Sequence, residues 1–353
     1  MRLLTYFTAF ALVGLLVAAP TSNDEDDEKV LVTPEFYIKD LVEYKAEHDI
    51  VKLVVPLNAL NFDETESSSE WDEIVSKFLV FFVEADVQPD GSRVDQGLYV
   101  LKDGKAKKIL DNGRDAAAAA ADDSKKVFFG AKDGLYKYNL ETNSADKYGP
   151  ITDSIIAMDM ERLSEVIYIL TEDRDVYKVT YNGERKEKLD DVVKPKQFVV
   201  DFGENLYFFS DDKVPYVRTV DGVKKIEGLP VATGTVTLFK PPFFLDNGAP
   251  VIINNKVYLM YSNGSSEATD FEFQPKAIPT ALAPEATLVQ YYAYDKKIYE
   301  YNILALIISS LVEEITDFLK KQATEINNFA SKETNLKRKL QPSEKSPKIK
   351  SHA

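Results

Sequence analysis

The sequence has no cysteine and only two histidines, and both shortages narrow the chemistry that the protein can perform. Disulfides, a thiolate nucleophile and a cysteine-ligated zinc site are excluded outright. His48 and His352 do not readily supply a Ser-His-Asp triad, an HExxH helix or a multi-histidine metal cage. Acid–base catalysis would have to rely on carboxylates alone. We therefore expect a protein that is not an enzyme, has no metal site and keeps its fold by burying apolar side chains.

Acidic residues outnumber basic ones, and the chain of 353 residues carries a net charge of −15. The charge is uneven, because residues 331–353 contain seven Lys or Arg and two Glu, which gives +5 there and −20 over the rest. A body this acidic repels nucleic acids and anionic membranes. We expect neither of them as a partner.

The N-terminus predicts export. Arg2 precedes a mostly apolar stretch over residues 3–19, and the very acidic sequence SNDEDDEK follows. This pattern is typical of a signal peptide cleaved between Ala18 and Asn23, although the exact position stays open. The stretch is short for the alternative, an uncleaved membrane anchor. We expect a secreted, extracellular protein, and Asn263, in the only glycosylation sequon, is the expected glycosylation site.

A tyrosine recurs at nearly even spacing along the chain and marks an internal repeat. The intervals are 37, 41, 39, 42 and 41 residues, and the tyrosines are Tyr99, Tyr136, Tyr177, Tyr216, Tyr258 and Tyr299. Each stands in a short run of alternating or β-branched apolar residues, which is typical of a strand. Two further apolar runs precede it, a polar run follows it, and Asp, Asn and Gly mark the turns between them.

Four short antiparallel strands in about forty residues describe one blade, so six such units predict an all-β, six-bladed β-propeller. The repeat also decides the structure of residues 116–121, a run of alanines that favours helix by propensity. Its place in the unit predicts an innermost strand, with small side chains where strands crowd around the axis. The strand-like run over residues 48–56 has no unit of its own, so we expect it to supply the outer strand of the last blade. Trp71 would then begin the innermost strand of the first blade, although WDEIVSKFLVFF also fits a helix that runs into a strand.

Helical spacing replaces the period of two after Ile303. Apolar residues then form one stripe at intervals of three and four, which predicts an amphipathic helix: Val312, Ile315, Leu319, Ala323 and Ile326. The apolar run is too short for a membrane anchor, so the helix would dock on the propeller or self-associate, and the oligomeric state stays open. From Ser331 the basic, Pro- and Ser-containing sequence predicts a disordered tail. The expected segments are signal peptide, acidic N-terminal segment, propeller, helix and tail, at residues 1–19, 20–44, 45–303, 304–330 and 331–353.

Two features invite a functional interpretation, but a structural one explains them better. A tyrosine present in every unit is expected to pack blade against blade, because a binding site is asymmetric and a ladder is not. Asp122, Asp159 and Asp201 follow the predicted inner strands and could suggest a metal site. Asp at a turn commonly caps its own backbone, and this is the interpretation that we favour.

The candidate ligand-binding residues come from the register of the repeat. In a propeller, function gathers around the axis on the face where inner strands begin and second-to-third strand loops emerge. Register places seven residues there, namely Arg114, Lys132, Asp153, Arg174, Lys196, Lys213 and Tyr292. The candidates among them are four cations, which would attract a small anionic ligand, and one aromatic residue: Arg114, Lys132, Arg174, Lys196 and Tyr292. Ordinary loop charge is the alternative at each position.

The repeat units themselves resemble the ommochrome-binding proteins of moth and butterfly haemolymph. The resemblance rests on the segments KKVFFGAKDGLYKYN, NLYFFSDDKVPYVRTVDGVKKIEGLP and ATLVQYYAYDKKIYEYNIL and spans about residues 48–303. It implies a secreted, non-enzymatic carrier of ommochromes, which are planar phenoxazinones bearing carboxylate and amino groups. It supplies no ligand motif, so the candidate residues rest on register alone. The tail after Ile303 departs from the family.

Three functions remain open. The favoured one is a secreted carrier that binds a small, aromatic, carboxylated ligand of the ommochrome type without chemical turnover. The second is a lactonase-like propeller hydrolase, which would need an axial metal held by Glu, Asn and Asp, and no NDG-type phrase starts an inner strand. The third is a secreted protein-interaction scaffold, because fold alone does not choose among the functions that propellers host. The choice of ommochrome and its redox state stay open.

Overall fold

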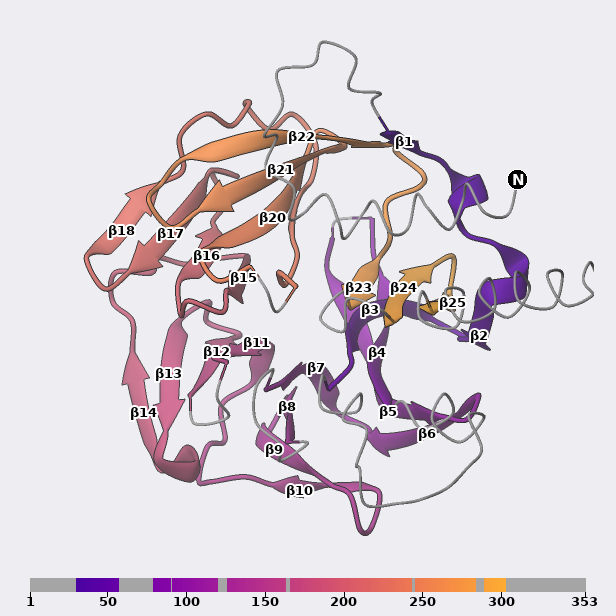
Figure 1. Cartoon of the computed structure of the whole chain (residues 1–353). Coiled ribbons are helices and arrows are strands. Elements are labelled where there is room, and N and C mark those ends of the chain that lie inside the picture. Colours follow the sequence, from indigo (N-terminus) through magenta and orange to yellow (C-terminus); the bar gives the residue numbers. More distant parts are fainter. Residues whose placement is uncertain are drawn as a thin grey trace, which may run out of the picture. The chain divides into compact units, whose positions relative to one another are not determined.

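The computed structural model describes residues 30–56, 79–89, 91–119, 126–162, 166–242, 245–283 and 289–302. The chain divides after Ile303 into two units, and all described residues belong to the first. Their strands form six sheets arranged as blades around a central axis (Figure 1). The expected all-β, six-bladed propeller is therefore confirmed. No helix within the described ranges is long and apolar enough to cross a membrane.

Blades 1 to 4 are continuous in the sequence, and each runs from its innermost to its outermost strand. Blade 1 contains β3 (Asp49–Val54), β4 (Val80–Val87), β5 (Arg93–Lys102) and β6 (Lys105–Leu110). Blade 2 contains β7 (Gly113–Ala118), β8 (Val127–Ala131), β9 (Gly134–Asn139) and β10 (Ser144–Lys147). Blade 3 contains β11 (Ile155–Met160), β12 (Ile167–Thr171), β13 (Val176–Thr180) and β14 (Arg185–Lys188), with the 3-10 helix η4 (Tyr181–Gly183) before β14. Blade 4 contains β15 (Gln197–Val200), β16 (Leu206–Phe209), β17 (Pro215–Thr219) and β18 (Gly222–Lys225).

Blades 5 and 6 are both completed by the N-terminal part of the chain. Blade 5 contains β19 (Val236–Leu238), β20 (Gly248–Ile253), β21 (Lys256–Tyr261) and β22 (Ser266–Phe273), and β1 (Val30–Val32) joins β22 as a parallel fifth strand. Blade 6 contains β23 (Ala281–Ala283), β24 (Val289–Tyr294) and β25 (Lys297–Asn302), with β2 (Val42–Lys45) as its antiparallel outer strand. Two 3-10 helices, η1 (Pro34–Phe36) and η2 (Lys39–Leu41), link β1 to β2.

The ring therefore closes differently from the sequence prediction. Residues 48–56 contain β3, the innermost strand of blade 1, and the outer strand of blade 6 is β2. The innermost strand of blade 1 does not begin at Trp71, which lies outside the described residues. Residues 30–44 belong to the propeller, so the boundary predicted at residue 45 lies too late. The apolar character of residues 53–55 is the overlooked signal, because an outer strand keeps a polar face.

The second strand of a blade is covered on both faces by neighbouring blades. Every residue of β8, β12, β16 and β20 is buried, which explains the strong apolar runs of the sequence. The alanine run forms β7 as predicted for Ala116–Ala118, and Ala116 and Ala117 are buried where inner strands crowd together. The signal peptide, the helix over residues 304–330 and the tail all lie outside the described residues.

The six repeat tyrosines all lie on third strands, and they pack the blades together as expected. The described core divides into six hydrophobic clusters, and each cluster contains or contacts one of these tyrosines. Each cluster joins residues of two neighbouring blades, as Phe81 of β4 and Phe129 of β8 do at a centroid distance of 5.5 Å. The ladder is therefore a structural repeat with one tyrosine at each seam.

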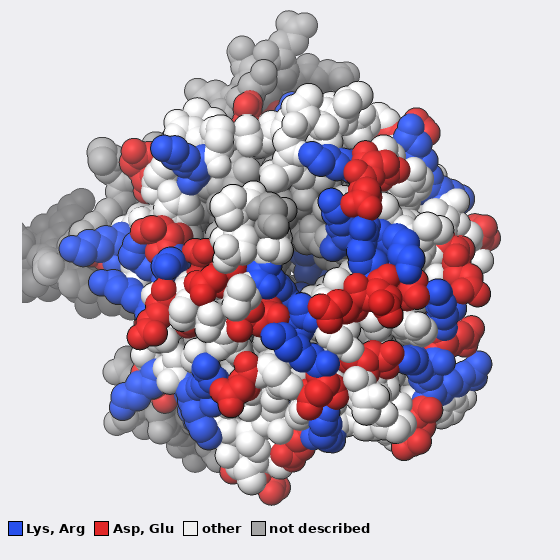
Figure 2. Space-filling view, turned by 180° about the vertical axis from the view of Figure 1, so that it is seen from behind, with Lys and Arg blue, Asp and Glu red and all other residues white. Residues whose placement is uncertain are grey.

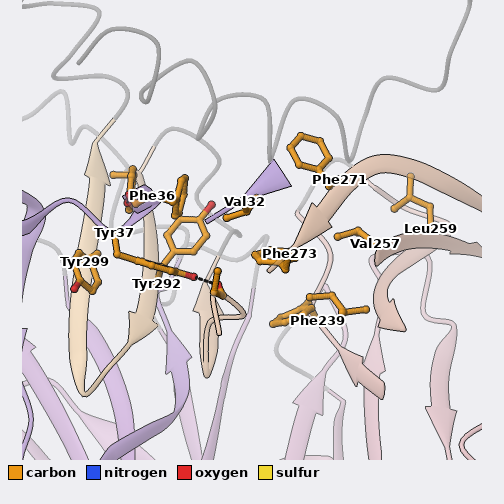
Figure 3. Close-up of a cluster of buried hydrophobic side chains, with 13 residues drawn as sticks. Val32, Phe36, Tyr37, Phe239, Val257, Leu259, Phe271, Phe273, Tyr292 and Tyr299 are labelled. Carbon is orange, nitrogen blue, oxygen red and sulfur yellow. Dashed lines mark hydrogen bonds between the residues drawn. The ribbon is translucent and has the colours of Figure 1, made fainter. Parts of the chain in front are cut away.

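The seam between blades 5 and 6 is filled by rings from the N-terminal segment (Figure 3). Phe36 stacks on Tyr301 of β25 at a centroid distance of 4.8 Å, and Tyr37 stacks on Tyr294 of β24 at 3.9 Å. The hydroxyl of Tyr37 donates a hydrogen bond to the carbonyl of Ala277 at 2.8 Å, and that residue follows β22 of blade 5. Residues 30–45 thus contact both blades and hold this seam together.

We expect Phe36→Ala to lower the free energy of unfolding by about 3 kcal/mol, because it removes a buried ring and leaves a cavity at the closing seam. Leu31→Ala in the same segment is the matched control, since Leu31 is 53% exposed and should cost less than about 0.5 kcal/mol. Urea denaturation followed by circular dichroism measures both changes. Equal, small effects of the two substitutions would contradict the role of this segment in ring closure.

Candidate functional site

Strand pairing brings six of the seven residues chosen by register to the same end of the blades. Inner strands begin at this end and second-to-third strand turns emerge there, because successive strands of a blade are antiparallel. Arg114 and Lys196 stand at the beginnings of β7 and β15, and Asp153 precedes β11. Lys132, Arg174 and Lys213 lie in turns between second and third strands. We call this end of the blades the loop face.

Tyr292 does not belong to the loop face, and its selection was wrong. It lies within β24, is 1% exposed, and packs in the cluster between blades 5 and 6. Its hydroxyl donates a hydrogen bond to the side-chain oxygen of Gln290 at 2.6 Å. Burial raises the pKa of this phenol above its usual value. The turn that follows β24 is formed by Asp295 and Lys296, so the register chosen for this blade was displaced by about three residues.

Arg174 and Lys196 converge on one carboxylate at the junction of blades 3 and 4. Arg174 Nη1 and Lys196 Nζ lie 2.8 and 2.9 Å from the two oxygens of Asp211, whose pKa they lower. Arg174 also donates to the backbone carbonyls of Lys194 and Pro195, in the linker between these blades. Its left-handed backbone, with φ of 60°, belongs to the tight turn that makes this reach possible. Both cations therefore join blades in addition to contributing positive charge.

A second group of charges lies where blades 1, 2 and 3 meet. Arg93 of β5 donates to the carbonyls of Arg114 on β7 and Ile156 on β11, so it crosses two inner strands. Nε of Arg93 lies 2.9 Å from Oδ1 of Asp95, and Nε of Arg114 lies 2.8 Å from Oδ2. Both contacts are ion pairs, and neither Asp95 Oδ1 nor Arg114 Nε makes a well-directed hydrogen bond. Two guanidinium groups thus share one buried carboxylate.

Arg114 reaches from this group toward the surface of the loop face. Its Nη1 donates to Ser154 Oγ at 3.0 Å and lies 3.6 Å from Oε2 of Glu172, in the turn after β12. The hydrogen bond from Ser154 and the charge of Arg114 lower the pKa of Glu172, and Lys132 contributes in the same direction. Arg114 and Lys132, two of the residues chosen from the sequence, therefore act on the same carboxylate.

Lys and Arg side chains gather near the centre of the ring on the face seen in Figure 2, where Asp and Glu side chains flank them. Of the loop-face cations, Lys213 donates to the carbonyl of Gly234 at 2.8 Å and ties blade 4 to the linker that leads into blade 5. Asp153 pairs with Lys186 of β14 at 2.7 Å. Among the described residues, Lys132 has no ion-pair partner within 4 Å.

Two inner-strand carboxylates link successive blades and were not recognised as a pair in the sequence. Asp115 of β7 accepts hydrogen bonds from its neighbour Ala116 and from the backbone N–H of Met158 on β11, the latter at 2.7 Å. Asp159 of β11 accepts in the same way from Met160 and from Val200 on β15. Lysines then balance the charges, with Lys52 Nζ at 3.2 Å from Asp115 and Lys240 Nζ at 2.7 Å from Asp159.

Asp159 therefore joins strands and does not cap a turn, whereas Asp201 does cap one as predicted. Asp201 Oδ1 accepts from the backbone N–H groups of Gly203 and Asn205, and Oδ2 accepts from the hydroxyl of Tyr207 at 3.0 Å. Asp122 lies outside the described residues. Within the described ranges, no three His, Cys, Asp or Glu side chains are grouped so that they could hold a metal ion.

Burial raises the pKa of Asp201 from 3.8 to about 6, even though several hydrogen bonds lower it. A raised carboxylate pKa means that the folded state binds the proton more tightly than the unfolded state. The contribution of Asp201 to stability is therefore fully present below about pH 4 and is lost as pH rises through about 6.

We expect the free energy of unfolding of the wild type, relative to Asp201→Asn, to fall between pH 4 and pH 7 by at most about 3 kcal/mol. Urea denaturation over this pH range measures the difference. Asp221→Asn, at an exposed turn, is the control and should leave the pH dependence unchanged. A difference between wild type and Asp201→Asn that does not vary with pH would show that the pKa of Asp201 is not raised.

The sequence carried only a weak signal for Arg93, Asp95 and Glu172, which were not among the predicted site residues. Arg93 and Asp95 belong to a β4–β5 hairpin whose strands have eight and ten residues, and the extra length was visible as polar sequence between two apolar runs. Glu172 lies close to the selected Arg174 in the sequence, but only cations and one aromatic residue were chosen as candidates, so the acidic Glu172 was not included. Asn263 lies exposed in the turn between β21 and β22, where its side chain accepts hydrogen bonds from Ser265.

Comparison with known proteins shows no family for this chain. No family model matches the sequence, and no curated protein matches it. Among solved structures, a similar one is PorZ, described as an essential bacterial surface component of the type-IX secretion system of Porphyromonas gingivalis. The TM-score is 0.42 and the identity 10%, over 72% of this chain and 37% of that one. The present chain thus spans little more than a third of PorZ, and the likeness carries no inference about function.

Proposed function

We propose that the protein is a secreted carrier that binds a small, aromatic, carboxylated molecule of the ommochrome type at the loop face, without chemical turnover. The observation that carries the proposal is the placement of Arg114, Lys132, Arg174 and Lys196 on one end of an otherwise acidic propeller. A region of positive potential on an acidic body attracts small anions while the body repels large polyanions. The resemblance of the repeat units to ommochrome-binding proteins is the second support.

The structure changes how such a ligand would be held. Tyr292 is buried, so the aromatic part of the ligand cannot stack on it. Arg174 and Lys196 already pair with Asp211. They therefore contribute a positive electrostatic potential, and a ligand carboxylate would have to displace Asp211 to contact them directly. Recognition in this proposal is therefore mainly electrostatic, and binding should weaken as salt screens the charges.

The two alternatives receive less support from the described residues. A lactonase-like hydrolase would use an axial metal, and two carboxylates on described inner strands, Asp115 and Asp159, are occupied by backbone N–H groups and lysines. A protein-interaction scaffold would use a contiguous apolar surface, whereas the exposed large apolar side chains are spread over several elements: Leu31, Val87, Val94, Leu140, Tyr181, Val193, Val220, Val223 and Val231.

Titration of the purified protein with xanthommatin should give saturable binding with a shift of the visible absorption band. Lys196→Gln should weaken binding about tenfold, because it removes one cation from the loop face. Arg185→Gln is the matched control, since Arg185 is an exposed cation on the outer strand β14 of blade 3 and should leave the affinity unchanged.

Mass spectrometry of the pigment recovered after incubation tests the absence of turnover, and an unchanged mass is expected. No saturable binding of xanthommatin at low salt would end the carrier proposal. A hydrolysed product, formed in proportion to protein and time, would replace it with an enzymatic function.

A further inference from the structure

Glu172 occupies an unusual place on the loop face, because its carboxylate faces cations that are built into the fold. Its side chain is 67% exposed, yet Arg114 contacts the carboxylate, and Ser154, Arg114 and Lys132 lower its pKa. The ion pair with Arg114 is long, at 3.6 Å, compared with 2.8 Å between Arg114 and Asp95. An exposed carboxylate on a long contact is easily displaced.

The cationic side of this contact is rigid. Asp95, whose side chain is 2% exposed, fixes Nε of Arg114, and Ser154 accepts a hydrogen bond from Nη1. Arg93 braces the same group through the carbonyl of Arg114. The guanidinium is therefore held in place before any ligand arrives, which lowers the entropic cost of binding an anion.

The acidic side, in contrast, can move without disturbing the fold. The backbone of Glu172 is anchored by its own N–H, which donates to the carbonyl of Ser154 at 2.9 Å. The turn around it is closed by hydrogen bonds between Thr171 and Asp175 and between Arg174 and Thr171. Only side-chain torsions of Glu172 need to change for its carboxylate to leave.

The local charge favours an additional anion. Arg93, Arg114 and Lys132 face two carboxylates, Asp95 and Glu172, which leaves one positive charge in excess. When the Glu172 side chain turns away, the excess at the site is two. Lys132, which has no ion-pair partner within 4 Å in the described part of the chain, then remains available to the incoming group.

We infer that Arg114, Ser154 and Lys132 form a binding site for the carboxylate of a small molecule, and that Glu172 fills this site as an internal placeholder in the free protein. The inference rests on the proposed carrier function for the identity of the ligand, and on the geometry alone for the site. The side chain of Glu172 already presents the group that the ligand would bring. A ligand carboxylate enters beside the hydroxyl of Ser154 with the same contact with Arg114, and the charge of Lys132 adds to the attraction.

The test uses 3-hydroxyanthranilate, a small fluorescent aromatic carboxylate, its uncharged methyl ester, and xanthommatin. Glu172→Gln removes the competing charge and should raise the affinity for 3-hydroxyanthranilate about tenfold, whereas Lys132→Gln should lower it about tenfold. The methyl ester should respond to neither substitution. Glu187→Gln is the matched control, because Glu187 is an exposed, ion-paired glutamate on β14 of the same blade.

The possible results of this experiment distinguish the carboxylate-binding site from the binding of the pigment. Opposite shifts for Glu172→Gln and Lys132→Gln, with no response of the ester, support the site even when xanthommatin does not bind. Binding of xanthommatin and 3-hydroxyanthranilate with affinities that both substitutions leave within twofold would overturn the placeholder and leave the carrier function standing. Failure of every variant to bind 3-hydroxyanthranilate would also overturn it. Urea denaturation of the variants, all altered at exposed side chains, verifies that the fold is intact.

Discussion

Closure of the ring is the constraint on which the rest of this structure depends. A blade hides its apolar faces only against its two neighbours, so an open ring would expose the buried second strands of the blades at the gap. Here the gap between blades 5 and 6 is closed by a segment from the other end of the sequence, with β1 on one blade and β2 on the other. Phe36 and Tyr37 fill the seam between them. The stability of both blades is therefore coupled to residues 30–45.

Polar contacts near the axis complement this apolar packing. Asp115 and Asp159 each satisfy a backbone N–H of the next blade, and lysines of other blades balance their charge. Lys240 reaches from blade 5 to Asp159 on blade 3 and so spans blade 4. A buried carboxylate without such donors would be costly, so these contacts fix the relative positions of the inner strands. The same contacts use the oxygens that a metal ion would otherwise need.

The repeat predicted the fold well, because its signal was present six times. The tyrosine spacing placed all six third strands, and the register overruled the helix propensity of Ala116–Ala118. Ring closure was predicted wrongly, because β2 has only four residues and a weak pattern, so the stronger run over residues 48–56 was assigned its role. A strand defined by its pairing partner, more than by its own residues, leaves little trace in the sequence.

The site was predictable only in part, for the same reason. Register placed Arg114, Lys132, Arg174 and Lys196 at the loop face, but it could not show which cations are already neutralised by partners distant in the sequence. Tyr292 shows the opposite error, because a displacement of about three residues in one blade moved a core residue to the surface in the prediction. Register predicts which end of a strand a residue occupies, and contacts decide whether its charge is available.

The loop face is asymmetric in part because blade 1 departs from the repeat. β4 and β5 have eight and ten residues, whereas the second and third strands of the other blades have four to six. The additional length brings Arg93 and Asp95 over the inner strands of blades 2 and 3, where Asp95 fixes Arg114. A group of charges that six identical blades could not build is thus created by one longer hairpin. The repeated tyrosines hold the blades together, and the longer β4–β5 hairpin makes the charged loop face asymmetric.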